Sequence, residues 1–88
     1  MPVISSFFGI LIKMFFADHA PPHFHAEYGV YKCLIGIKDF AIVEGYLPPR
    51  ALSLVIEWAS QHQEELMGNW KVLSENEKGK FNKIEPLK

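Results

Sequence analysis

The segment from His23 to Gly36 constrains the fold of this chain most, because its side chains alternate in character around a central Gly29-Val30 pair. Glycine at the first central position suits a type II′ turn, which joins two antiparallel strands. A two-residue loop there pairs Tyr28 with Tyr31 and makes one face wholly apolar. The other predicted pairs are Ala26 with Cys33, Phe24 with Ile35, Glu27 with Lys32, His25 with Leu34 and His23 with Gly36. A slip of one residue would bury the histidines and expose Phe24, so we expect this register.

The segments before this hairpin also predict strands. Residues 3–8 and 10–16 are dense in β-branched and aromatic side chains without a 3.6-residue period, and Gly9 between them suits a bulge or a tight turn. Residues 17–22 contain two consecutive prolines, which predict a rigid loop because each proline fixes its own φ.

After the hairpin we expect a short strand over 41–46 and then a helix that opens at Pro49, where the missing N–H is harmless. Apolar residues recur at helical spacing from Leu52 onward, so this helix covers a sheet. The sequence does not decide whether this helix ends at Gly68 or continues to Leu73. A last short strand is expected over 81–84.

Composition agrees with one folded domain over residues 1–88, with 49% hydrophobic and 22% charged residues. A net charge of -1 argues against a general nucleic-acid binder, and the single Cys33 excludes an internal disulfide. The apolar run near the start is interrupted and too short to cross a bilayer, so we expect a cytoplasmic protein without a membrane segment. The predicted fold class is α+β: an antiparallel meander sheet with one long helix in the C-terminal half packed on one face.

Three of the four histidines lie close together in the sequence, with carboxylates beside them. Positions 23, 25 and 27 of a strand point the same way, and the loop with Asp18 and His19 enters at the end of that strand. We therefore predict a site on this polar face. Its candidate members are Asp18, His19, His23, His25 and Glu27.

Three interpretations of this site stand side by side. Imidazole and carboxylate ligands at all five positions suit a divalent transition metal. Alternatively, the histidines act as catalytic acids and bases on a phosphodiester, with Arg50, Lys13 or Lys32 to hold the phosphate; of these we favour Arg50. In the structural interpretation, the histidines only hydrogen-bond a loop. Outside the site, His62 and Cys33 are expected to be packing residues, and so are Trp58, Trp70, Phe24 and Phe40.

Three motifs give the chain a family resemblance: F-A-D-H-A-P-P-H-F-H-A-E-Y-G over 16–29, G-Y-L-P-P-R over 45–50 and K-I-E-P-L near the end. With them the chain resembles a bacterial family catalogued as the domain-of-unknown-function 4160 family. The likeness covers nearly the whole chain. It implies a small, single-domain cytoplasmic protein whose gene neighbours that of another small domain, an arrangement that has suggested toxin-antitoxin modules. It assigns no catalytic residue.

We therefore expect a component of a two-gene toxin-antitoxin module that acts on RNA through His19, His23 and His25, with a partner protein from the neighbouring gene. The alternative is a non-catalytic module that holds a metal or a protein on the same face. Transcriptional regulation ranks last, because the sequence has no helix-turn-helix pattern. The early strands are apolar on both alternating sets, which suits either a central sheet position or a homo-oligomer surface.

Overall fold

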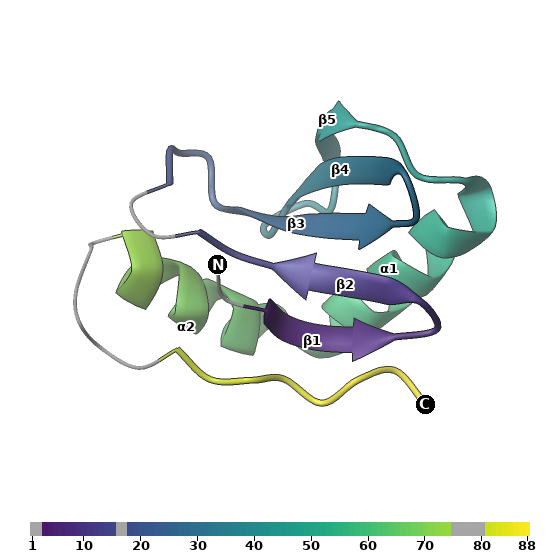
Figure 1. Cartoon of the computed structure of the whole chain (residues 1–88). Helices are drawn as coiled ribbons and strands as arrows, with labels where there is room; N and C mark the ends of the chain where they lie inside the picture. Colours follow the sequence, from purple (N-terminus) through teal and green to yellow (C-terminus); the bar gives the residue numbers. More distant parts are fainter. Residues whose placement is uncertain (1–2, 16–17, 75–80) are drawn as a thin grey trace.

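A computed structural model of the chain describes residues 3–15, 18–74 and 81–88 (Figure 1). Five strands form one sheet in the order β1-β2-β3-β4-β5, and each strand is antiparallel to the next. Their bounds are β1 Val3–Phe7, β2 Ile10–Lys13, β3 His23–Tyr28, β4 Tyr31–Gly36 and β5 Ile42–Gly45. The predicted α+β meander is confirmed.

The β3–β4 hairpin has the predicted register at all six pairs, from His23 opposite Gly36 to Tyr28 opposite Tyr31. Gly29 has a φ of 59°, the positive value that the first central position of a type II′ turn requires. The apolar face of this hairpin is buried except at the turn, where Tyr28 and Tyr31 are 39% and 41% exposed. Its fully buried members are Phe24, Ala26, Cys33 and Ile35, each 0% exposed.

The first two strands are shorter than predicted. Phe8 and Gly9 form the turn between them, with φ values of 48° and 80°. Two-residue hairpins of type I′ need positive φ at both central positions, so the turn takes Phe8 out of the strand as well as Gly9. At the other end, β2 stops at Lys13 instead of Phe16, which lies outside the described residues.

The edge strand β5 turns a tight corner against β4. Gly45 has a φ of 89°, and a Cβ at this position would collide with the carbonyl oxygen of Lys32. The backbone N–H of Tyr46 donates to that same oxygen at 3.0 Å. Position 45 therefore accepts only glycine, which has no side chain.

The single long helix predicted after Pro48 is wrong in one respect, because the structure divides it into α1 (Pro49–Gln61) and α2 (Gln63–Ser74). His62 interrupts the helix with a φ of -132°. The Gln63 amide donates to the carbonyls of Ile37 and Lys38 at 2.8 and 3.1 Å, and these contacts redirect the chain. Gly68 lies inside α2 and does not end it.

Trp58 on α1 is the centre of the core. Its ring lies 5.3 Å from that of Phe7 and 6.0 Å from that of Phe24, and it is 0% exposed. These contacts pack α1 on the apolar face of the sheet, where a buried aromatic side chain contributes the largest apolar area of any residue type. Leu66, Trp70 and Leu73 of α2 are buried as the helical spacing predicted.

Residues 81–88 run beside β1 without forming the predicted strand (Figure 1). The Ile84 N–H donates to the Ile4 carbonyl at 2.8 Å, but side chains of the helices take up neighbouring backbone groups. Trp58 Nε1–H donates to the Glu85 carbonyl at 2.7 Å, and Asn69 makes two 2.8 Å hydrogen bonds with the backbone of Asn82. A regular ladder through Ile84 would need the Asn82 backbone groups for pairing.

Candidate functional site

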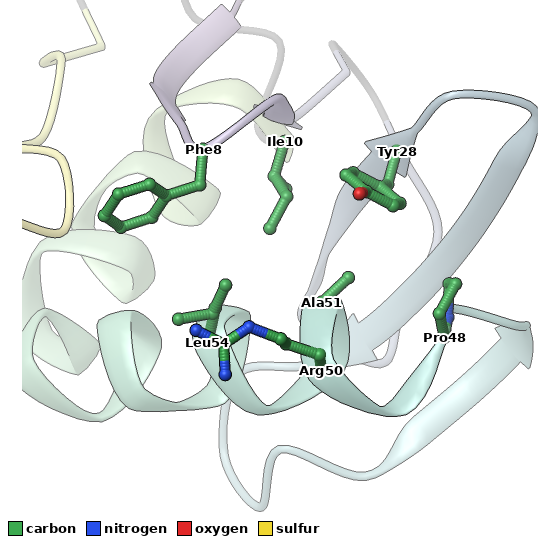
Figure 2. A pocket seen from close by; sticks show the side chains of 7 residues that line it. All are labelled: Phe8, Ile10, Tyr28, Pro48, Arg50, Ala51 and Leu54. Atoms are coloured by element: carbon green, nitrogen blue, oxygen red, sulfur yellow. The ribbon is translucent and has the colours of Figure 1, made fainter.

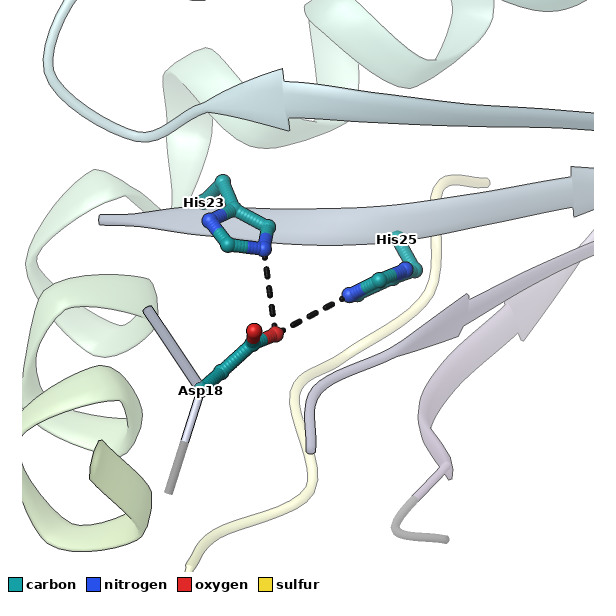
Figure 3. Close-up of side chains that lie close together, drawn as sticks. All are labelled: Asp18, His23 and His25. Carbon is teal, nitrogen blue, oxygen red and sulfur yellow. Dashed lines mark hydrogen bonds and ion pairs between the residues drawn. The ribbon is translucent and has the colours of Figure 1, made fainter. Parts of the chain in front are cut away.

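Asp18, His23 and His25 converge at the start of β3 (Figure 3). Asp18 Oδ2 lies 3.0 Å from His23 Nε2 and 3.2 Å from His25 Nε2. One ligand-type atom from each of the three residues falls within 4.8 Å of the others. We call these three residues the Asp-His cluster.

His23 is the buried member of the cluster, with 5% of its surface exposed. Its Nδ1 lies 2.7 Å from the Pro21 carbonyl oxygen. A carbonyl only accepts, so Nδ1 carries a hydrogen and a neutral ring has its lone pair on Nε2. That Nε2 is buried and has no aligned hydrogen-bond partner among residues 3–15, 18–74 and 81–88, although Asp18 Oδ2 is 3.0 Å away. The Trp70 ring of α2, 5.1 Å from the His23 ring, covers the imidazole.

His25 faces the same carboxylate from the next same-side position of β3. Its ring stands edge-on to Phe15 at 4.3 Å, and 21% of its side chain is exposed. Its Nε2 makes the one aligned hydrogen bond between two side chains of the cluster among the described residues, to Asp18 Oδ2. Solvent therefore reaches the cluster from the His25 side.

Asp18 is held from both of its oxygens. The His19 backbone N–H donates to Oδ1 at 2.9 Å, while Oδ2 faces the imidazoles. Burial acts to raise the pKa of the Asp18 carboxyl, but the His25 hydrogen bond, the His19 N–H and the charges of His23 and His25 together lower its pKa below the ordinary value of 3.8. Asp18 is thus an ionised carboxylate at neutral pH.

Three predicted members lie outside the cluster. The His19 side chain is exposed, and only its backbone touches Asp18. The Glu27 carboxylate lies 3.2 Å from Lys13 Nζ, because β2 places Lys13 opposite His25 and within diagonal reach of Glu27. Arg50 lines a pocket with Tyr28, at the opposite end of β3.

Other residues behave as predicted for packing residues. His62 lies 5.6 Å from Trp58 and pairs with Glu65 at 2.7 Å. Burial raises the pKa of the Cys33 thiol above its ordinary value, as expected of a core cysteine. Trp58, Trp70 and Phe24 are buried and Phe40 is partly buried.

Sequence reasoning missed the parts of the site that come from distant or backbone groups. The Pro21 carbonyl orients His23, and the two rings that enclose the cluster, Phe15 and Trp70, come from β2's extension and from α2. Trp70 was assigned to the core, and no spacing pattern in the sequence links it to a histidine in β3.

Residues 9–71 match the family model described as Domain of unknown function (DUF4160). The chain belongs to this family. The matched DUF4160 region contains the whole Asp-His cluster, and Arg50 as well. No curated protein and no solved structure matches the chain.

Proposed function

We propose that this protein binds a divalent transition-metal ion through Asp18 Oδ2, His23 Nε2 and His25 Nε2. The observation that carries the proposal is the buried Nε2 of His23. In a neutral ring its lone pair points toward two further ligand-type atoms, and it has no aligned hydrogen-bond partner in the part of the chain that the structure describes. A buried polar atom left without a partner costs about 1–3 kcal/mol, so such an atom calls for an occupant.

Electrostatics favours a cation at this place. In a neutral His23 ring the Pro21 carbonyl holds the proton on Nδ1, so the lone pair on Nε2 faces a carboxylate oxygen at 3.0 Å. Two electron-rich atoms repel at this separation unless a positive charge lies between them. A metal ion supplies that charge to all three ligands at once, provided that the His25 hydrogen which now bonds Asp18 Oδ2 moves from Nε2 to Nδ1.

The ligand set and its spacing suit a transition metal. Atoms bound to one ion at about 2.0–2.1 Å lie roughly 2.9–3.4 Å apart when they are adjacent in the coordination sphere. The two carboxylate-to-imidazole distances, 3.0 and 3.2 Å, fall in this range, and because the three atoms lie within 4.8 Å of one another, small side-chain shifts would bring the two imidazoles around one ion. Two imidazoles with one carboxylate favour zinc, iron, cobalt or nickel over calcium or magnesium, which prefer oxygen ligands. The Pro21 carbonyl fulfils the usual role of a backbone group that orients a metal-bound histidine.

Three protein ligands leave coordination positions open for water or substrate. The exposed fractions of the Asp18 and His25 side chains, 19% and 21%, give solvent access to those positions. A bound metal would lower the pKa of a coordinated water and so provide a nucleophile near neutral pH. In this proposal the protein positions and partly desolvates that water.

Isothermal titration with Zn²⁺ and Co²⁺, followed by elemental analysis of the dialysed protein, tests the proposal. We expect one ion per chain, and for Co²⁺ a visible absorption band of a nitrogen- and oxygen-ligated site. Asp18→Asn and His25→Gln should each weaken binding by at least about 100-fold, because losing a ligand costs more than losing a group that orients one. The matched control is His19→Gln, which changes an exposed imidazole in the same loop and should keep wild-type affinity. An equal loss in the control, or no binding by the wild type, would contradict the proposal.

Action on RNA within a toxin-antitoxin module stays a prediction that the same site can test. A metal-dependent reaction on RNA would stop with chelator and with Asp18→Asn. A metal-free reaction by the histidines would survive chelator. In this proposal Arg50 takes no part in the metal-dependent or the metal-free reaction, because it lies at the opposite end of β3 from the Asp-His cluster.

A further inference from the structure

A second feature of the molecule is a pocket of about 260 Å³ between the ends of the first hairpin strands and the first turns of α1 (Figure 2). Ile10, Ala51 and Leu54 form its apolar walls, and two of them, Ile10 and Ala51, are buried. It shares no lining residue with the Asp-His cluster.

Phe8 stands on one side of the pocket in an unusual conformation. Its φ of 48° lies in the left-handed region, which bulky residues rarely adopt, and 59% of its surface is exposed. A strained backbone that holds an apolar ring in solvent contributes little to the stability of this chain alone. The ring is, however, well placed to contact something in the pocket.

Tyr28 stands on the other side, 39% exposed, at the end of β3 (Figure 2). Its ring lies beside Gly9, where a Cβ would be 3.6 Å from Tyr28 Cε1. The turn that orients Phe8 therefore also supports Tyr28. Two exposed aromatic rings thus flank one apolar pocket.

Arg50 adds a positive charge to the rim of the pocket. Within the described part of the chain, its guanidinium makes no ion pair. It lies in the first turn of α1, which holds no acidic residue and where a cation opposes the helix dipole. An anionic group placed beside Arg50 would relieve both unfavourable interactions, and a carboxylate matches the fork of guanidinium donors.

We propose that this pocket binds a small aromatic carboxylate, with its ring between Phe8 and Tyr28 and its carboxylate on Arg50. Aromatic rings favour offset or edge-on contacts with other rings, which selects an aromatic ligand over an aliphatic one. The volume is below the roughly 300–1,000 Å³ of pockets for drug-sized ligands, so the ligand has a single ring. Among the described residues that line the pocket, Arg50 is the one cation, which matches a monoanion better than a phosphate dianion.

Titration of the full chain with phenylacetate and 3-phenylpropionate, followed by two-dimensional NMR, tests this proposal. We expect saturable shifts at Phe8, Tyr28 and Arg50 for both acids. Phenylacetamide, which keeps the ring without the charge, should bind at least about tenfold more weakly, the loss expected for one charge-assisted hydrogen-bond pair. Acetate, which keeps the charge without the ring, should also bind at least about tenfold more weakly, because it lacks the ring's apolar and aromatic contacts. Equal binding of phenylacetamide, or no saturable shift with either acid, would overturn the proposal.

Two variants localise the binding. Arg50→Gln should lower affinity by about tenfold or more, and Phe8→Gly should lower it while the fold is kept, because glycine accepts a positive φ without strain. Lys71→Gln, which removes an exposed cation near the end of α2, is the control and should bind as the wild type does. Asp18→Asn should also bind the acids normally, so failure at this pocket and failure at the metal site can be told apart. Unchanged affinity in Arg50→Gln would overturn the assignment.

Discussion

The two ends of β3 carry opposite kinds of chemistry. At the His23 end, polar atoms are buried against one another, and Trp70 covers them. At the Tyr28 end, aromatic rings are exposed and a single cation has no acidic neighbour in its helical turn. The strand is six residues long, so these ends are about 17 Å apart.

Side chains alternate between the two faces of a strand, so β3 can contribute to the Asp-His cluster on one face and to the pocket on the other. His23 and His25 point to one side of the sheet, whereas Tyr28 shares the side of Phe24 and Ala26, on which α1 packs. The cluster and the pocket therefore differ in face as well as in end. Changes at one should leave the other intact, unless they disturb the strand itself.

The largest effect should come from a change that destabilises β3 itself, because both sites depend on this strand. Phe24→Ala deletes a fully buried ring between the two ends, where it packs on Trp58, and should lower the free energy of unfolding by about 3–5 kcal/mol. Urea denaturation measures this, and both metal and carboxylate binding should weaken together. Val30→Ala, at a 90% exposed turn position, is the control and should change stability by less than about 0.5 kcal/mol. If only one site weakened in Phe24→Ala, the strand would not be their common support.

A smaller loss of stability should be confined to the His23 end of β3. Asn69 is 3% exposed and hydrogen-bonds both the N–H and the carbonyl of Asn82, next to Trp70 on α2. Asn69→Ala leaves those groups unpaired and should cost about 1–3 kcal/mol of stability. Hydrogen exchange should show faster opening of α2 and unchanged protection of the β1–β2 turn. Faster exchange at that turn would mean that the two ends are coupled.

The ion pair beside the cluster should matter still less. Lys13 and Glu27 keep 15% and 23% of their side chains exposed, so Glu27→Gln should change stability by no more than about 1 kcal/mol. Metal affinity should stay at the wild-type value, since Glu27 pairs with Lys13 and lies outside the cluster. A large fall in affinity would add Glu27 to the ligands.

The smallest effect at neutral pH should be at Cys33, which lies between the two ends on the buried face. Burial raises the pKa of its thiol, so the folded protein holds this proton more tightly than the unfolded chain does. Its contribution to stability is therefore complete below the ordinary pKa of 9.0 and is lost as the pH rises above it. Reaction with a disulfide reagent at pH 7 should be slow in the folded protein and fast in urea, and Cys33→Ala should abolish both signals. Rapid labelling of the native protein would place the thiol at the surface.

Elements with strong local signals could be predicted from the sequence. The hairpin register followed from the alternation of residues 23–36, because only one register buries Phe24 and pairs Glu27 with Lys32. The same alternation brought His23 and His25 to one face, and the loop position of Asp18 added the third member. Family membership also followed from local motifs.

Features that depend on distant contacts could not be predicted. No glycine or proline marks the helix break at His62, which is held by the Gln63 amide on the carbonyls of Ile37 and Lys38. Nor does spacing show that Glu27 would pair with Lys13, or that Arg50 would lie beside Tyr28. Each of these outcomes depends on how strands and helices meet in space.

The corner at Gly45 has a consequence for recognising chains of this shape. A side chain there strikes the Lys32 carbonyl, whereas a Cβ at Gly68 would have no atom within 4 Å. Saturation mutagenesis should thus return glycine alone at position 45 and a broad choice at position 68. Glycine three residues after the start of β5 would then identify this meander even in a chain that lacks the histidines.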